Sequence, residues 1–225
     1  MPNWVRCQFR NISDMEKFKQ LAIDKKRGDI DFNLLLPMPE TLNIVRPQRG
    51  ELPKDFEFPT IEDETQLDGF LQYCADQGVN ISLALAHWNN GKYGFADWYD
   101  WRIAHWGTKW NAVSGISGEW DSGDYFETAW SMPENWLREL AKHLDFTLDY
   151  ADEDMGSNCG RVTSSDGVFD ITHPDTDAEA LAFAYYIHYG DCAETALKDD
   201  AKANPENYDL QDAAENYNEL INNWI

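Results

Sequence analysis

The chain has 225 residues, of which 43% are hydrophobic and 14% aromatic, and its formal net charge at pH 7 is −23. This apolar content is ample for a packed core, which excludes a disordered chain. No run of about 18 apolar residues occurs, so no membrane-spanning helix is expected. The acidity argues against direct binding to nucleic acid or to anionic membranes, because carboxylates repel phosphates.

The negative charge is concentrated in the last third of the chain. Residues 1–144 contain 22 acidic and 15 basic side chains, whereas residues 145–225 contain 19 acidic and 3 basic side chains. A surface of this composition attracts basic proteins, including those that normally hold a phosphate backbone. We therefore expect a basic nucleic-acid-binding protein as the partner.

The first half of the chain combines strand and helix patterns. Alternating apolar and polar residues over 3–10 predict a strand, and a capped amphipathic helix is expected over about 14–27. An apolar run ending at two prolines predicts a second strand over 31–38. A further helix is expected over about 61–78, and the Asn-Asn-Gly triplet at 89–91 indicates a turn.

A tryptophan-rich stretch follows, with indoles at positions 98, 101, 106 and 110. Its spacing predicts a short helix that ends at Gly107, since glycine readily adopts the left-handed conformation that terminates helices. The residues after Gly107 are expected to be irregular or extended. Because tryptophan buries more area than other side chains, this cluster is predicted to nucleate a core.

The second half repeats the strand and helix pattern. A strand is predicted over 123–130, and Ser131 with the following Pro and Glu is typical of a helix N-terminus. Alternation predicts a strand over 146–150, and residues 158–164 and 168–172 are expected to pair as a hairpin. Three helices are then expected, a largely buried one over 175–189, a second over about 191–203 and an amphipathic one over 207–224.

Four features, in this order, resemble a known family: the start Met-Pro-Asn-Trp-Val; Phe32-Asn33 before Pro-Met-Pro; Trp98-Tyr-Asp-Trp followed by Trp-Gly-Thr-Lys-Trp-Asn at 106–111; and Phe-Glu-Thr-Ala-Trp-Ser-Met-Pro at 126–133. The sequence resembles the YubB-type ferredoxin-like proteins carried by plasmids and bacteriophages, over about residues 1–172. This resemblance implies an α+β ferredoxin-like sandwich, an antiparallel sheet with helices on one face, and an origin on a mobile element. It implies no agreed activity.

The resemblance and the element pattern together predict the domain organisation. A ferredoxin-like domain is expected over 1–174, with a tryptophan-rich insert at about 61–111. Residues 175–225 are expected to form an acidic helical C-terminal extension. The four cysteines lie far apart, which favours reduced thiols in the cytoplasm of a bacterial host over a disulfide framework.

Motifs for catalysis and cofactor binding are absent from the sequence. The five histidines are scattered, and no phosphate-binding glycine loop, nucleophile elbow or metal-ligand spacing occurs. We therefore assign no catalytic residue and expect neither a metal nor a cofactor. His105 is interpreted as a structural core histidine rather than a catalytic one.

The first functional hypothesis is a protein without catalytic activity that inhibits a host defence complex, a CRISPR effector or a restriction enzyme, by mimicking DNA. Acidic residues three or four apart on a helix lie about 5–6 Å apart, close to the spacing of backbone phosphates. A solvated charged face that only aids solubility is the alternative interpretation of the same residues. The predicted acidic face consists of Asp191, Glu194, Asp199, Asp200, Asp209, Asp212, Glu215 and Glu219.

A second hypothesis is a nucleotide or small-ligand binding protein, or an enzyme, with a pocket at the Trp-Gly-Thr-Lys-Trp-Asn motif, where indoles would stack on a flat ligand. In a third, the same motif serves folding alone, and its polar groups satisfy indole and backbone atoms. The residues of this alternative pocket are His105, Trp106, Lys109, Trp110 and Asn111.

Overall fold

The computed structural model describes residues 3–45, 52–61, 64–114 and 124–225. The chain divides into two compact units, the first formed by Met1–Leu36 with Trp106–Ile225 and the second by Pro37–His105. Each unit has a hydrophobic core of its own. The predicted boundary between residues 174 and 175 falls inside the first unit and stays a prediction.

A six-stranded antiparallel sheet forms the centre of the first unit, as the described residues define it, with the strand order β2-β3-β1-β4-β5-β6. A bulge between Phe9 and Asn11 shifts the register of β1 against β4. The strands are β1 (Trp4–Ile12), β2 (Val113–Ser114), β3 (Tyr125–Ala129), β4 (Phe146–Asp152), β5 (Cys159–Ser165) and β6 (Val168–Thr172).

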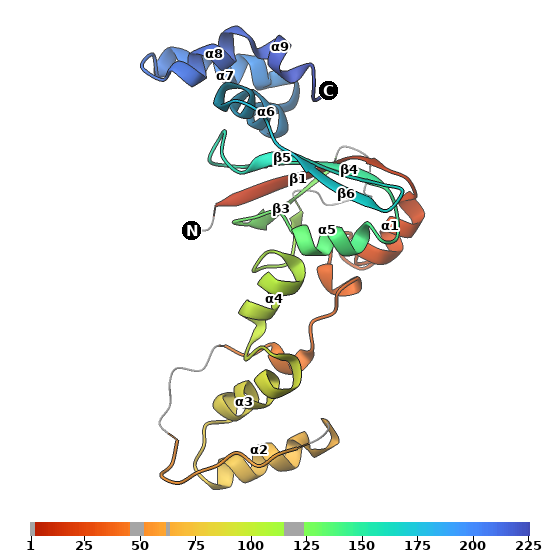
Figure 1. Cartoon of the computed structure of the whole chain (residues 1–225), viewed down its shortest axis with the longest axis vertical. Helices are drawn as coiled ribbons and strands as arrows, with labels where there is room; N and C mark the ends of the chain where they lie inside the picture. Colours follow the sequence, from red (N-terminus) through yellow and green to blue (C-terminus); the bar gives the residue numbers. More distant parts are fainter. Residues whose placement is uncertain (1–2, 46–51, 62–63, 115–123) are drawn as a thin grey trace. The chain divides into compact units, whose positions relative to one another are not determined.

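One face of the sheet carries the aromatic core of the first unit. Helices α1 (Met15–Ala22) and α5 (Glu134–Leu140) lie on this side, as Figure 1 shows. Phe9 of β1 is the centre of the packing, because its ring lies 5.0 Å from that of Phe18 and 5.6 Å from that of Phe146. Such tilted and edge-on aromatic pairs stabilise a core beyond their buried area.

The opposite face of the sheet is covered by helix α6 (Asp177–Tyr189), and the helices that follow it, α7 (Ala193–Ala203), α8 (Tyr208–Glu215) and α9 (Tyr217–Ile221), pack against α6. Ala151 and Cys159 of the sheet belong to the same buried cluster as these helices. A buried carboxylate also lies on this face, where Asp149 accepts hydrogen bonds from Arg10 at 2.7 Å and Arg161 at 2.6 Å. The predicted α+β ferredoxin-like class with a C-terminal helical extension is confirmed, and both sheet faces are covered.

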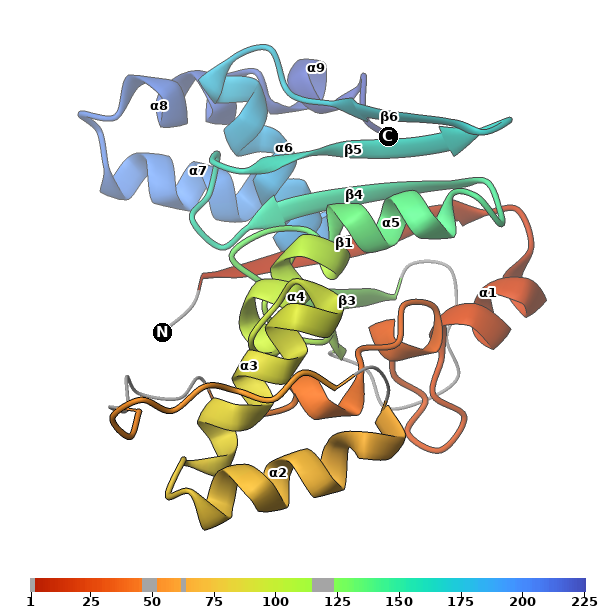
Figure 2. The same cartoon turned by 60° about the horizontal axis from the view of Figure 1, so that its bottom comes forward.

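The second unit is helical over its described residues. Helices α2 (Leu67–Asp76) and α3 (Ile81–Tyr93) pack against each other, and α4 (Trp98–Trp106) carries the first three predicted tryptophans. Figure 2 shows these helices and the extended segment that precedes α2. None of the helices in the described ranges is both long and apolar enough to cross a bilayer.

Several predicted elements are confirmed, including the first strand, the hairpin of β5 and β6, and a tryptophan-rich helix ending at Gly107. The predicted strand over 31–38 is wrong. Asp31 instead accepts a hydrogen bond from the backbone N–H of Asn33 and starts a short 3-10 helix, Phe32–Leu34. The predicted turn at 89–91 is also wrong, because these residues lie within α3, which continues to Gly94 at φ 77°.

Candidate functional site

The motif segments that the sequence analysis singled out converge at one place in the first unit. Trp110 packs on Trp4 with ring centroids 5.8 Å apart, and Trp106 packs edge-on against Phe32 at 5.6 Å. The turn after β3, which carries the Ala-Trp-Ser part of the fourth motif, is hydrogen-bonded to the same loop. Residues separated by more than a hundred positions therefore form one cluster, which we call the motif cluster: Trp4, Asp31, Phe32, residues 106–111 and residues 129–131.

Gly107 and Trp106 fix the base of the motif cluster. Trp106 is fully buried, and its indole Nε1 donates to the carbonyl oxygen of Leu36 at 3.0 Å. Gly107 has φ 85°, and a Cβ at this position would lie 2.8 Å from the backbone nitrogen of Glu134 at the start of α5. Only glycine fits both the left-handed conformation and this close approach.

Two hydroxyl groups join the loop to the turn after β3. Thr108 donates to the carbonyl oxygen of Ala129 at 2.9 Å, and Ser131 donates to the carbonyl oxygen of Gly107 at 2.6 Å. The prediction that Ser131 caps a helix is therefore wrong, because its hydroxyl bonds to this loop and α5 has no side-chain cap at its N-terminus.

Asn111 has a structural role in the motif cluster. Its Oδ1 accepts hydrogen bonds from the backbone N–H groups of Phe32 and Ala112, at 2.9 and 3.0 Å, and its Nδ2 donates to Asp31 at 2.7 Å. These contacts use both ends of the amide. Asn111 is thus engaged by the protein itself, as the third hypothesis expects of the motif's polar groups.

At the edge of the motif cluster a half-buried lysine lies close to two indoles. The Lys109 ammonium lies 4.1 Å from the ring centroid of Trp110 and 3.4 Å from that of Trp130. Trp130 has φ 73° and remains 48% exposed. A bulky residue in the left-handed region is strained, and such strain is often found at functional sites. Only the resemblance motif pointed to Trp130, because its approach to Lys109 depends on tertiary structure.

His105, which was grouped with the alternative pocket, belongs to the second unit, whereas the other four residues belong to the first. Its ring stacks on Trp101 with centroids 4.1 Å apart, and its Nδ1 lies 2.9 Å from the carbonyl oxygen of Trp101. These contacts fit the predicted structural role of this histidine.

The predicted acidic face lies on the helices that cover the second face of the sheet. Seven of its eight side chains are exposed, and Glu194 is half-buried. The opposite sides of the same helices are buried, as Leu197, Leu210 and Ala213 show. Amphipathic packing thus orients the carboxylates toward solvent.

Three of the eight carboxylates have a lysine or a tyrosine as a partner. Glu194 pairs with Lys198 and Asp199 pairs with Lys202, while Asp200 accepts a hydrogen bond from the hydroxyl of Tyr185. Within the described ranges, no lysine, arginine or histidine forms an ion pair with the other five. These five, which we call the unpaired acids, are Asp191, Asp209, Asp212, Glu215 and Glu219.

The acidic stripe over 207–224 is less continuous than predicted. Asp209, Asp212 and Glu215 share α8 at intervals of three residues, but the predicted single helix breaks at Asn216 and Glu219 lies on α9. The amide of Asn216 donates to the side chain of Asp212 at 2.7 Å, and its backbone N–H bonds to the carbonyl oxygen of the same residue. One helix therefore presents three carboxylates in a row instead of four.

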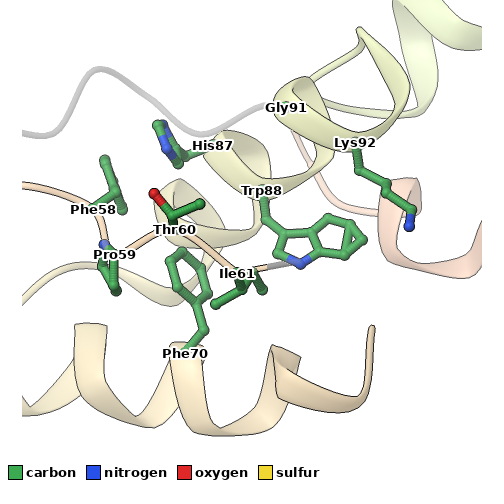
Figure 3. Close-up of a pocket in the computed structure, with 9 residues that line it drawn as sticks. All are labelled: Phe58, Pro59, Thr60, Ile61, Phe70, His87, Trp88, Gly91 and Lys92. Atoms are coloured by element: carbon green, nitrogen blue, oxygen red, sulfur yellow. The ribbon is translucent and has the colours of Figure 1, made fainter. Parts of the chain in front are cut away.

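A cavity in the second unit was not predicted from the sequence. It has a volume of about 340 Å³ and lies between α2, α3 and the extended segment before them (Figure 3). Its wall contains Phe58 and His87, whose rings stack at a centroid distance of 3.9 Å, and the indole of Trp88. The side chains meet only in the folded unit, so no local motif signals the cavity.

Two of the cysteine thiols are strongly shielded by burial. Desolvation raises the pKa of the Cys159 thiol to about 11, and burial also raises the pKa of Cys7 far above its usual range. Such thiols are poor nucleophiles at neutral pH. Among the residues that the structure describes, no three His, Cys, Asp or Glu side chains meet in a way that could hold a metal ion.

Comparison with known proteins gives one family. Residues 105–193 match the model of a family described as a ferredoxin-like domain in Api92-like protein. The match begins at the tryptophan motif, includes β3 to β6 and extends through α6. No curated protein and no solved structure matches the chain.

Proposed function

We propose that this is a non-enzymatic binding protein whose acidic face docks on the basic surface of a nucleic-acid-binding protein. The observation that carries the proposal is the orientation of the acidic face, whose eight carboxylates include seven exposed ones on helices that bury their opposite sides. Residues 175–225 contain twelve acidic side chains and only two lysines. A basic groove would meet mainly negative charge here, which favours fast, salt-sensitive association.

The finer form of the proposal concerns the partner and the origin of the chain. The row of three carboxylates on α8 repeats at about 5–6 Å, which resembles the repeat of phosphates along a nucleic-acid strand. The resemblance to plasmid and phage proteins supplies a setting in which a host nucleic-acid-binding complex is a target. We therefore propose that a phage- or plasmid-borne chain occupies the DNA-binding groove of a CRISPR effector or a restriction enzyme.

A competition assay tests this proposal. Fluorescent duplex DNA is bound to a purified CRISPR effector complex or restriction enzyme, and its release is followed by anisotropy as the protein is added. We expect the wild type to displace DNA at low salt and to lose this ability as salt increases. Displacement that ignores salt, or binding that leaves the DNA in place, contradicts mimicry.

Two matched variants separate local charge from total charge. In the first, the five unpaired acids are changed to the corresponding amides, and we expect displacement to weaken at least tenfold. The second removes the same charge from exposed acids elsewhere and should displace DNA like the wild type. The control substitutions are Glu57→Gln, Asp68→Asn, Glu153→Gln, Asp166→Asn and Asp170→Asn.

A ligand site at the motif cluster is the second candidate function. The observation that favours it is the exposed, strained Trp130, which holds its ring beside Lys109 and Trp110. Indole rings and a cation suit a flat anionic ligand such as a nucleotide. In a thermal-shift screen with nucleotides, a shift that Lys109→Ala abolishes supports this site, and no shift with any nucleotide removes it.

A further inference from the structure

The cavity of the second unit is lined by residues from three segments. Helix α3 contributes His87, Trp88 and Gly91, helix α2 contributes Phe70, and the extended segment before α2 contributes Phe58 and Thr60. Figure 3 shows His87 beside Phe58 on one side, the ring of Trp88 on the other, and Phe70 of α2 below them. Its volume of about 340 Å³ is within the range of small-molecule sites, and four aromatic side chains, Phe58, Phe70, His87 and Trp88, form part of its wall.

An unpartnered hydrogen-bond donor belongs to one of the residues that line this space. Trp88 is only 6% exposed, and its indole Nε1 is buried without an acceptor anywhere in the described chain. Figure 3 places this nitrogen on the side of the ring that faces Ile61 and Phe70. A buried N–H without a partner carries a desolvation cost, so such groups are uncommon in folded proteins. An acceptor that enters the cavity would remove this cost.

The flat walls of the cavity restrict the shape of the occupant. The rings of Phe58 and His87 are nearly parallel, with an interplanar angle of 10°. Burial lowers the pKa of His87, which favours the neutral imidazole at pH 7 and above. Among the described residues, Lys92 is the only lysine or arginine on the wall, and its ammonium lies 5.7 Å from the Trp88 ring on the exposed side of α3.

We infer that this cavity binds a small planar aromatic molecule whose ring carries a hydrogen-bond acceptor, with the Trp88 indole N–H as the donor. The aromatic walls contact the ring, and the acceptor satisfies the buried donor. The site lies in the second unit, whereas the acidic face and the motif cluster lie in the first. The inference therefore goes beyond the proposed function, and either can fail without the other.

A matched pair of probes tests the role of the donor. 4-Methylpyridine and toluene have nearly the same shape, but only the former carries a ring acceptor. We expect 4-methylpyridine at pH 8 to shift the indole N–H resonance of Trp88 downfield and to bind about fivefold to tenfold more tightly than toluene. Trp88→Phe identifies the resonance among the ten tryptophans and should abolish the preference.

A filling variant tests the location. Gly91 lies within α3, and a Cβ at this position meets nothing within 4 Å, so Gly91→Leu can place its side chain toward the cavity without disturbing the backbone. We expect this variant to remain folded and to lose binding of both probes. Gly69→Leu is the matched control, because Gly69 has equal space on α2 but does not line the cavity, and it should bind like the wild type. Equal affinity for the two probes, no response at Trp88, or unchanged binding in folded Gly91→Leu would overturn the inference.

Discussion

At the residue scale, the most constrained charge in the protein is the carboxylate of Asp149. Its side chain is fully buried, and it accepts hydrogen bonds from Arg10 and from two nitrogens of Arg161, at 2.6–2.8 Å. Arg161 also donates to the carbonyl oxygen of Trp224, near the end of the chain. A single carboxylate thus links two strands of the sheet to the C-terminal segment.

Replacement of Asp149 by Asn should be strongly destabilising. Both guanidinium groups are about three quarters buried and would lose their anion, and the loss of one partner from a buried ion pair typically costs about 3–5 kcal/mol. Urea denaturation measures this difference. Glu134→Gln is the control, because its pair with Arg138 is exposed and should contribute less than about 1 kcal/mol. Equal effects of the two substitutions would contradict the assigned role of Asp149.

Truncation of Trp106 should change the stability of the protein much more than truncation of Trp130. Trp106 is fully buried, so Trp106→Ala should cost about 3–5 kcal/mol. Trp130→Gly relieves about 1 kcal/mol or more of left-handed strain and loses a cation–π contact of similar size, so the net change should be within about 1 kcal/mol. Thermal denaturation of the two variants compares them. A large loss of stability in Trp130→Gly would assign this residue to folding and remove a motive for the ligand site.

At the element scale, helix α6 is joined to the sheet by a histidine. The His188 Nε2 lies 3.2 Å from the carbonyl oxygen of Ala151 and 3.1 Å from that of Asp152, so the neutral ring can donate to β4. Burial lowers the pKa of His188, and the nearby Arg6 lowers it further, although Glu127 opposes this effect. The folded protein therefore favours the uncharged imidazole.

This pKa shift gives a pH dependence of definite sign. The unfolded chain binds a proton at about pH 6.5, before the folded chain does, so the free energy of unfolding should fall as the pH decreases below about 6.5. Above that pH, His188 should contribute no slope. Denaturation between pH 5 and pH 8 measures the effect, and His188→Gln, which can still donate but does not titrate, should reduce the slope. A slope that the variant does not change would exclude His188 as its source.

The elements that the sequence predicts correctly are those whose pattern agrees with their burial. β1 alternates between buried and half-buried side chains, and the β5–β6 hairpin turns at Asp166 and Gly167, which both have positive φ. The failures come from side-chain hydrogen bonds. Asn89, which is buried within α3, donates a hydrogen bond to the carbonyl oxygen of Thr41. The Asn-Asn-Gly triplet at 89–91, which favours a turn in isolation, is therefore helical.

The candidate sites also differ in how much of each one the sequence predicts. Lys109 and Trp110 are adjacent in the chain, so their aromatic setting is visible in the sequence, whereas Trp130 reaches them only through the fold. The exposure of the acidic face follows from helical periodicity, but the break at Asn216, where φ is −108° and ψ is 15°, is not visible in that periodicity. The cavity of the second unit depends on the packing of three segments and has no signal in any of them.

At the scale of the whole molecule, the dominant property is the net charge of −23. Like charges on a compact molecule repel one another, and this self-repulsion destabilises the folded state. Ion pairs on α7 offset the charge of two carboxylates, but the five unpaired acids lie on exposed positions of the same helical segment. A surface that binds a basic partner is thus expected to reduce the stability of the free protein.

Salt should therefore stabilise the protein. The Debye length falls from about 30 Å at 0.01 M to about 3 Å at 1 M ionic strength, so added NaCl screens repulsion between separated carboxylates. We expect the melting temperature to rise between 20 and about 500 mM NaCl, and the variant with amides at the unpaired acids to melt higher at low salt and to respond less. The variant with five amides elsewhere carries the same net charge, so it separates local crowding from total charge. If both variants gain equally, the acids of the C-terminal helices are not crowded, and a concentrated electrostatic surface, which the proposed docking requires, is not present.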